Sequence, residues 1–300
     1  MSAVLDGVDA TPVTVEIDVG SGLPAFTIVG LPDATVQEAR DRVRGAITHS
    51  GEEYPMARIT ANLAPSDLRK QGAGLDLVLA LCILVAKDRA PHEGLRDRLF
   101  VGELGLAGDV RPVRGALQAA EAAGRAGLRE VVCPVPNAAE AALAGLPAIP
   151  VRTLREAIEV VKGHSPSPTT ADPEALLSAP PSAWMDLAQI REQERAKRVL
   201  EIAASGGHNV LFSGPPGSGK TLLARALPGI LPRLTLAEAL EVTRIHSAAG
   251  LLPPGEPLVR MRPFRSPHHG VSVAGMVGGG SHWARPGEIT LAHPSITICT

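Results

Sequence analysis

The chain of 300 residues is longer than one hydrophobic core usually supports, so we expect two domains. Hydrophobic residues make up 45% and charged residues 20%, which is typical of globular proteins and excludes a disordered chain. The formal net charge of -2 excludes a globally basic nucleic-acid binder, although a local basic patch is still compatible with it.

The cysteines and the apolar segments indicate the cellular compartment of the protein. The sequence contains three cysteines: Cys82, Cys133 and Cys299. They are far apart and form no CxxC motif, so neither a disulfide framework nor a zinc site is indicated. The first ten residues carry Asp6 and Asp9 and do not resemble a signal peptide. The longest apolar stretch, residues 75–86, is shorter than the roughly 20 residues that span a bilayer. We therefore expect a cytoplasmic protein with no membrane association.

Strands and helices alternate through the first half of the chain. Hydrophobic patterns predict strands at residues 11–19, 25–29, 58–63 and 131–134, and a strand pair at 99–106. Helical spacing predicts helices at residues 75–86, 116–126, 137–143 and 154–161. This order of elements predicts an α/β or α+β domain over residues 1–163.

One more helix is expected to begin at Thr35, because Thr35 and Glu38 form the pattern of a capping box. Gly51 follows its end, where a left-handed residue is often needed. The face predicted to be buried has five members: Val36, Ala39, Val43, Ala46 and Ile47.

A linker is predicted at residues 164–182, which are rich in Pro, Ser and Thr and show no apolar period. Residues 183–300 are then a second domain. In it we expect a helix at residues 191–205, a short apolar strand at 208–213 and another helix from Gly219.

Between that strand and that helix lies a full match to the phosphate-binding motif GxxxxGK[ST]. Its residues are Gly214, Pro215, Pro216, Gly217, Ser218, Gly219, Lys220 and Thr221. Glycines let successive N–H groups face one concavity at a helix N-terminus, where phosphate oxygens bind. Lys220 would neutralise the β and γ phosphates, and Thr221 would offer its hydroxyl to Mg²⁺. The motif predicts binding of ATP with Mg²⁺. A glycine-rich turn needed only for packing has no use for Lys followed by Thr.

Hydrolysis of ATP also needs an acid at the end of an apolar strand. No Asp follows Asp186, and no four-residue apolar run after the motif ends in an acid. The acids beyond the motif are Glu238, Glu241, Glu256 and Glu288. If the chain turned ATP over, Glu288 is the acid that we would expect to take the catalytic place.

Several long segments resemble the YifB/ComM family of magnesium-chelatase-like AAA+ ATPases. They are GLPAFTIVGLPDATVQEARDRVRGAI from Gly22, RITANLAPSDLRKQG from Arg58, VGELGLAGDVRPVRGAL from Val101, GGHNVLFSGPPGSGKTLLARALPGILP from Gly206, EVTRIHSAAGL, RPFRSPHH and RPGEITLAH. The resemblance covers nearly the whole chain. It implies a ribosomal S5 domain 2-type (Lon-protease-like) domain followed by an AAA+ domain. It also implies ring-shaped homo-oligomers that act on DNA in the full-length family.

The resemblance also carries site residues. An adenine-side motif is matched by Ile190 and Gln193, while Glu192 stands where Gly is usual. In the family the LAH segment leads into an apolar strand ending in Asp-Glu, whereas this sequence continues with PSITICT. The Walker B acid, sensors, arginine finger and lid are therefore expected to be missing, which implies an ATP-binding chain deficient in hydrolysis.

Two other classes of protein are alternatives to an ATPase. A Lon-like serine peptidase needs a Ser and a Lys, but alignment on residues 70–72 puts Gly74 and Leu117 at those positions. Ser66 and Lys70 would meet if their segment were helical, an arrangement that is common on surfaces. The other class is a non-catalytic interaction or assembly module.

The remaining polar segments give weaker hypotheses. Five histidines suggest a metal site, but no HExxH or Cys partner accompanies them, which favours a structural use: His246, His268, His269, His282 and His293. A loop that interleaves arginines with an aromatic residue suits either DNA contact or simple solvation: Arg260, Arg262, Phe264 and Arg265. Residues 278–280 are glycines without a following Lys, which predicts a flexible loop.

Overall fold

The computed structural model describes residues 1–179, 185–279 and 285–294, and the chain in it divides into two units. Unit 1 comprises Met1–Ala171 and Ser247–Pro257, and unit 2 comprises Asp172–His246 and Leu258–Thr300. Residues 164–171 of the predicted linker therefore belong to unit 1. Among the described residues, no helix combines the length and the apolar character needed to cross a membrane.

Four strands form the first sheet of unit 1, in the order β1-β2-β4-β3. Their bounds are β1 Ser2–Asp6, β2 Asp9–Gly20, β3 Ala25–Val29 and β4 Arg58–Ala64. β2 runs antiparallel to both β1 and β4, while β3 runs parallel to β4. Alternation along β4 buries Ile59, Ala61 and Leu63 completely. The predicted strands at 11–19, 25–29 and 58–63 are confirmed, and β1 was not predicted.

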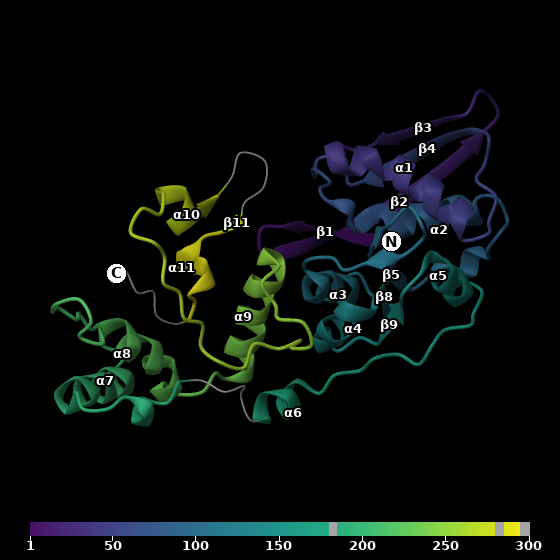
Figure 1. Ribbon diagram of the computed structural model, residues 1–300. Helices are drawn as coiled ribbons and strands as arrows, with labels where there is room; N and C mark the ends of the chain where they lie inside the picture. Colours follow the sequence, from purple (N-terminus) through teal and green to yellow (C-terminus); the bar gives the residue numbers. More distant parts are fainter. Residues whose placement is uncertain (180–184, 280–284, 295–300) are drawn as a thin grey trace. The chain divides into compact units, whose positions relative to one another are not determined.

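Helices α1 (Ala34–His49) and α2 (Asp76–Val85) pack against each other and enclose the core with this sheet (Figure 1). All five residues of the predicted α1 face are buried. The predicted capping box is wrong, because Asp33 is the N-cap residue and its carboxylate accepts from the Val36 amide at 2.8 Å. Gly51 after the helix has a φ of +87°.

A second sheet of unit 1 has three parallel strands in the order β5-β8-β9. Its strands are β5 Arg98–Phe100, β8 Glu130–Pro134 and β9 Ala148–Val151, and a separate antiparallel pair joins β6 Glu103–Leu104 to β7 Val110–Arg111. The predicted strand pair at 99–106 thus contains two strands that pair with other partners.

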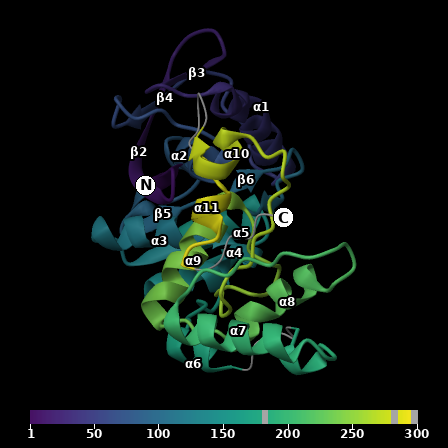
Figure 2. The ribbon, with the colours of Figure 1, turned by 90° about the vertical axis from the view of Figure 1, so that its left-hand side faces the viewer.

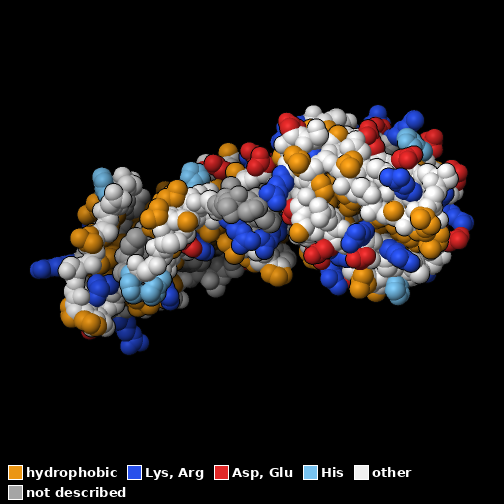
Figure 3. Space-filling model, turned by 90° about the horizontal axis from the view of Figure 1, so that it is seen from above, with side chains coloured by type: hydrophobic (Ala, Val, Ile, Leu, Met, Phe, Trp, Pro, Cys, Tyr) orange, Lys and Arg blue, Asp and Glu red, His pale blue; other side chains and the backbone are white. Residues whose placement is uncertain are grey.

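The helices of this region are α3 Ala116–Arg125, α4 Val135–Ala141 and α5 Leu154–Val161, with 3-10 turns η1 Ala73–Leu75, η2 His92–Leu95 and η3 Ala142–Ala144. α3 and α4 bring mostly alanines to a second buried cluster, which also includes Leu99 and Val131 of the strands. Charged side chains of both signs are interspersed over the face of unit 1 that Figure 3 shows.

The predicted linker is partly structured. Thr169 exchanges two backbone hydrogen bonds with Ala148 of β9, at 2.7 and 3.0 Å. Asp172 then caps a short helix, α6 (Pro173–Ser178), with its side chain. The Pro-, Ser- and Thr-rich composition did not predict this helix, although Asp172 supplies its cap and Pro173 its first helical residue. Residues 180–182 lie outside the described residues.

Unit 2 is mainly helical where it is described. Its elements are η4 Leu187–Gln189, α7 Glu194–Gly206, α8 Lys220–Ala226, η5 Leu227–Ile230, α9 Leu236–Ala249, α10 Val273–Val277, β10 Gly278–Gly279, β11 Arg285–Pro286 and α11 Glu288–Leu291. α7 and α8 lie side by side (Figures 1 and 2) and share one apolar cluster, to which Leu200 and Leu223 contribute. The last three residues of α9 belong to unit 1.

The predicted strand at residues 208–213 is wrong. This segment has no regular structure, and Leu211 within it is 92% exposed. A strand needs a neighbour for its backbone N–H and C=O groups. No strand among the described residues pairs with this segment, so its apolar composition alone does not make it a strand.

Candidate nucleotide-binding site

The phosphate-binding motif forms a turn that leads directly into α8. Gly217 and Gly219 have φ values of +80° and +82°, and Gly219 is the N-cap residue of the helix. Side chains strain the backbone in this left-handed region, so both positions suit glycine. The backbone of the motif therefore adopts conformations that favour glycine at the positions where its sequence has glycine.

Lys220 folds back over this turn. Its ammonium donates to the carbonyl oxygens of Gly214 at 3.0 Å and Pro215 at 2.8 Å, and to the hydroxyl of Ser218 at 3.3 Å. Three donors thus meet three acceptors within the loop itself. The positive charge of Lys220 is thus held at the loop, and Thr221 beside it is exposed.

The adenine-side residues occupy different environments. Ile190 is 5% exposed and belongs to the apolar cluster that also contains Leu223 of α8. Gln193 is exposed at the start of α7 with a φ of +64°, and Glu192 before it has a φ of +57°. This geometry gives a physical reason for the family's usual glycine at position 192, since only glycine adopts such a φ without strain.

Three of the four acids that follow the motif, Glu238, Glu241 and Glu288, are engaged by other side chains. Arg265 donates two hydrogen bonds to Glu288, at 2.6 and 2.7 Å, and thereby lowers the pKa of that carboxyl. Glu241 lies 3.3 Å from the His293 ring. Glu288 is therefore not free to act as the catalytic acid that the sequence suggested.

Glu238 is held at the start of α9. Its carboxylate accepts from the Thr235 amide at 2.8 Å, and the Glu238 amide donates to the Thr235 hydroxyl at 3.3 Å. This is a capping box, and Thr-x-x-Glu at 235–238 was its readable signal. The Thr235 amide is the main cause of the lowered pKa of Glu238, to which Arg262 also contributes.

The arginines proposed for DNA contact are tied within unit 2. Arg262 donates to the Pro232 carbonyl at 2.7 Å and to Glu238 at 3.2 Å, and its side chain is 14% exposed. The Arg265 side chain is 30% exposed and pairs with Glu288. The interpretation of these two residues as a solvated basic loop is wrong, because both guanidinium groups are paired with carboxylates.

The histidines do not assemble a metal site in the part of the chain that the structure describes, where no group of three or more potential ligands occurs. His268 and His269 are exposed, with ring centroids 4.0 Å apart. His246 is half-buried, and burial and Arg265 lower its pKa. His282 lies outside the described residues.

The peptidase positions carry no suitable chemistry. Gly74 lies in η1, and Leu117 is completely buried in α3. Ser66 and Lys70 are not on a helix: Ser66 is exposed in a turn, while Lys70 is buried and its ammonium donates to the Pro65 carbonyl. Burial lowers the pKa of Lys70. The geometry therefore gives Ser66 no support as a nucleophile.

Comparison with known proteins gives two family matches, one in each half of the chain. The family profile described as magnesium chelatase, subunit ChlI, matches residues 186–298, and that described as subunit ChlI of Mg-chelatase matches residues 15–137. An uncharacterised protein of Mycobacterium tuberculosis (strain H37Rv) is 47% identical over 299 residues, which are 98% of this chain and 58% of the relative.

Two further relatives carry family names. YifB of Escherichia coli (strain K12) is 44% identical over 97% of this chain and 56% of its own length. Competence protein ComM of Haemophilus influenzae is 42% identical over 95% of this chain and 56% of its own length. The chain belongs to the YifB/ComM family of magnesium-chelatase-like AAA+ ATPases. It spans between 56% and 58% of the length of these relatives.

Proposed function

We propose that unit 2 binds ATP together with Mg²⁺ at residues 214–221. The observation that carries the proposal is the Lys220 ammonium, which sits over a turn whose glycines adopt left-handed conformations. Phosphate oxygens would replace the Gly214 and Pro215 carbonyls as acceptors for this ammonium. The exposed Thr221 hydroxyl would contact Mg²⁺, which prefers oxygen ligands.

For the base, we propose the start of α7. Gln193 is exposed there and offers an amide, while buried Ile190 supports the segment from the core that it shares with α8. Glu192 and Gln193 have left-handed backbone conformations, so the chain turns between the buried Ile190 and the exposed Gln193. The proposed roles are therefore direct contact for Gln193 and support for Ile190.

We also propose that residues 1–300 hydrolyse ATP slowly. Glu238, Glu241 and Glu288 each have a partner, and a carboxylate paired with Arg265 is not available to Mg²⁺ or water. Without an acid that places Mg²⁺ and water, transition-state stabilisation is incomplete. Phosphate release by purified protein should match that of Lys220→Ala, and Lys220-dependent turnover would refute this proposal.

Nucleotide binding is tested by calorimetry and by thermal unfolding with Mg-ATP. Binding to the folded state at 100 times the dissociation constant should stabilise unit 2 by about 2.7 kcal/mol. Lys220→Ala should remove the effect, whereas Lys162→Ala should keep it, because Lys162 pairs with Glu159 in unit 1. Equal binding by Lys220→Ala and the unsubstituted protein would refute the site. Failure of both to bind would instead favour an assembly module.

The family resemblance supports further proposals about the whole protein. They are action on DNA, assembly of rings of identical chains, a cytoplasmic location, and a ribosomal S5 domain 2-type (Lon-like) fold for the domain at residues 1–163, with a linker at 164–182 and an AAA+ domain at 183–300. DNA binding is tested by fluorescence anisotropy with labelled single-stranded DNA. Contacts to phosphates require the affinity to fall as salt rises, and a salt-independent signal would refute them.

A further inference from the structure

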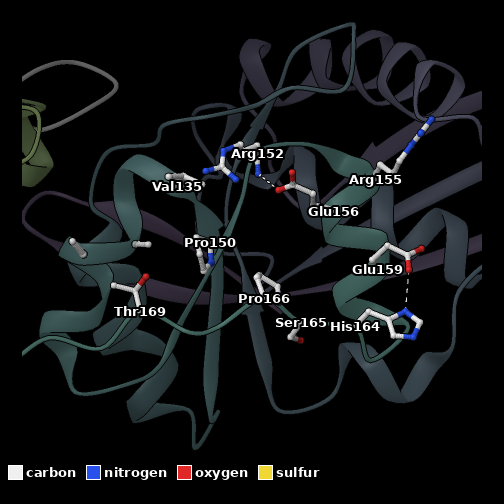
Figure 4. Close-up of a pocket in the computed structure, with 12 residues that line it drawn as sticks. Val135, Pro150, Arg152, Arg155, Glu156, Glu159, His164, Ser165, Pro166 and Thr169 are labelled. Atoms are coloured by element: carbon white, nitrogen blue, oxygen red, sulfur yellow. Dashed lines mark hydrogen bonds and ion pairs between the residues drawn. The ribbon is translucent and has the colours of Figure 1, made fainter.

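A hollow in unit 1 lies outside the proposed nucleotide site. It is lined by α4, the end of β9, α5 and the segment 164–169, and it has a volume of about 750 Å³ (Figure 4). Ligand pockets in proteins commonly measure about 300–1,000 Å³. All of its walls belong to unit 1, so the hollow does not depend on how the two units are placed.

The wall of the hollow is apolar at its centre. Val135, Ala138 and Pro150 line it from α4 and β9, and Pro166 lines it from the segment that follows α5. Thr169 anchors that segment to Ala148, and His164 anchors it to Glu159 at 2.9 Å. Such a surface suits the aliphatic part of a ligand, because moving apolar groups out of water lowers the free energy.

Arg152 differs from the other charged residues of the hollow in how its side chain is bonded. Its backbone amide donates to Glu156 at 2.7 Å, but its guanidinium makes no hydrogen bond or ion pair with any residue that the structure describes. Figure 4 shows this side chain extending toward Val135, on the opposite side of the hollow from Glu159. Arg155, in contrast, points away and donates to the Ser50 carbonyl at 3.1 Å.

The charges decide what kind of anion fits. Arg152 is the one cation of this lining with no partner in the described chain, while Glu156 and Glu159 add two carboxylates. A single guanidinium pairs well with a monoanionic carboxylate in a bidentate manner. A phosphate with two charges would be repelled by the Glu156 carboxylate. The Glu159 carboxylate lies 3.1 Å from the Lys162 ammonium and 2.9 Å from the His164 ring, and a hydrogen-bond donor at the far end of the ligand would join these partners.

We propose that this hollow binds a small aliphatic carboxylate whose other end carries an amino or hydroxyl group, with Arg152 as the carboxylate contact. The proposal adds a second site to the protein and is independent of ATP binding. Glu159 and His164 form the opposite end, and the apolar wall between the two ends receives the aliphatic body.

The test is a titration of the full chain with 6-aminohexanoate, followed by methyl NMR spectra. Val135, Ala138 and Ala139 line the hollow and serve as reporters, while the buried Ala119 and Ala120 of α3 serve as internal controls. Concentrations up to about 10 mM cover the affinity expected of a small fragment. The reporters should shift in a saturable manner, and the controls should not.

Variants separate the proposal from non-specific binding. Arg152→Ala should weaken binding about tenfold or more, because a charge-assisted pair is lost. Arg155→Ala is the matched control and should bind like the unsubstituted protein. Glu159→Gln should reduce the preference for 6-aminohexanoate over hexanoate.

Three results would overturn the proposal. The first is the absence of shifts at the reporters with every probe. The second is saturable binding that Arg152→Ala leaves unchanged. The third is hexyl phosphate or hexylamine binding as well as 6-aminohexanoate, since either would contradict the charge argument. Arg152 and Arg155 are exposed, so thermal unfolding of their variants should match that of the unsubstituted chain. Glu159→Gln loses ion pairs with Lys162 and His164 and should lower the midpoint only slightly.

Discussion

The ion pair between Arg42 and Asp76 gives a sharp test of how unit 1 is held together. Asp76 begins α2 and is completely buried, and it accepts from Arg42 on α1 at 2.6 and 3.1 Å. The same carboxylate accepts from the Leu104 amide at 3.2 Å. One side chain therefore joins α1, α2 and β6.

Replacing Asp76 by Ala should destabilise unit 1 by about 3–5 kcal/mol, the usual cost of removing one partner of a buried pair. The Arg42 side chain is 18% exposed, so its charge would be left largely buried, with the exposed Glu38 at 3.7 Å as its remaining carboxylate partner. The Leu104 amide would also lose its acceptor. In the double variant Arg42→Met/Asp76→Ala both charges of the pair are gone, so the loss should be well below the sum of the losses in Arg42→Met and Asp76→Ala.

Urea unfolding of the full chain measures these losses. Tyr54 is the only tyrosine of the sequence and lies in unit 1. Its absorbance therefore follows the unfolding of unit 1. Glu53→Ala is the control, because it breaks an exposed pair with Arg89 and should cost less than about 1 kcal/mol.

Two results would refute the reasoning about Asp76. One is a loss for Asp76→Ala no larger than that of the Glu53→Ala control. The other is simple additivity of the Arg42 and Asp76 substitutions, which would mean that the pair has no coupling energy. The pH adds a check: burial raises the pKa of Asp76, so the penalty of Arg42→Met should shrink as the pH falls and Asp76 becomes neutral.

Three more predictions follow from buried titratable groups. Burial raises the pKa of Glu140 above the ordinary value of about 4.3. Between these two pKa values the native state binds more protons than the unfolded state, so stability falls as the pH rises. Glu140→Gln should remove this pH dependence from the urea midpoints followed by Tyr54. Burial and Arg265 lower the pKa of His246, so stability should be lost as pH falls below about 6.5, and His246→Gln should remove this loss in urea unfolding followed by circular dichroism. Burial raises the pKa of Cys133 to about 12, so in a Cys82→Ser/Cys299→Ser background it should react with Ellman's reagent only after unfolding, and fast native reaction would contradict this.

Periodicity predicted the elements of unit 1 well where an element has one clear face. α5 and β3 have the predicted bounds, and every residue predicted on the buried face of α1 is buried. β9 was missed because Pro150 interrupts its pattern, yet a sheet edge tolerates a residue without an amide donor. Patterns describe a strand's own residues and do not say whether it lies at an edge.

The phosphate motif shows the same division between local and distant causes. The positive φ values of Gly217 and Gly219 could be expected from the motif, since they arise within a few residues of chain. The strand expected at 208–213 depends on a neighbouring strand, and local apolar composition cannot supply one. The turn and the lysine are therefore readable from sequence, while the sheet around them is not.

The arginines at 262 and 265 show why local composition misleads about binding surfaces. An arginine cluster beside an aromatic residue looks like a phosphate-contacting loop when only neighbours in sequence are considered. The fold brings Glu238 and Glu288 from 24 and 23 residues away and pairs them with these arginines. Removing either arginine would leave a carboxylate without its partner, so a loss of DNA binding in Arg265→Ala would not by itself identify a DNA contact. Arg265→Ala/Glu288→Ala removes both charges of the pair, and a binding defect that this double variant retains would point to the arginine itself.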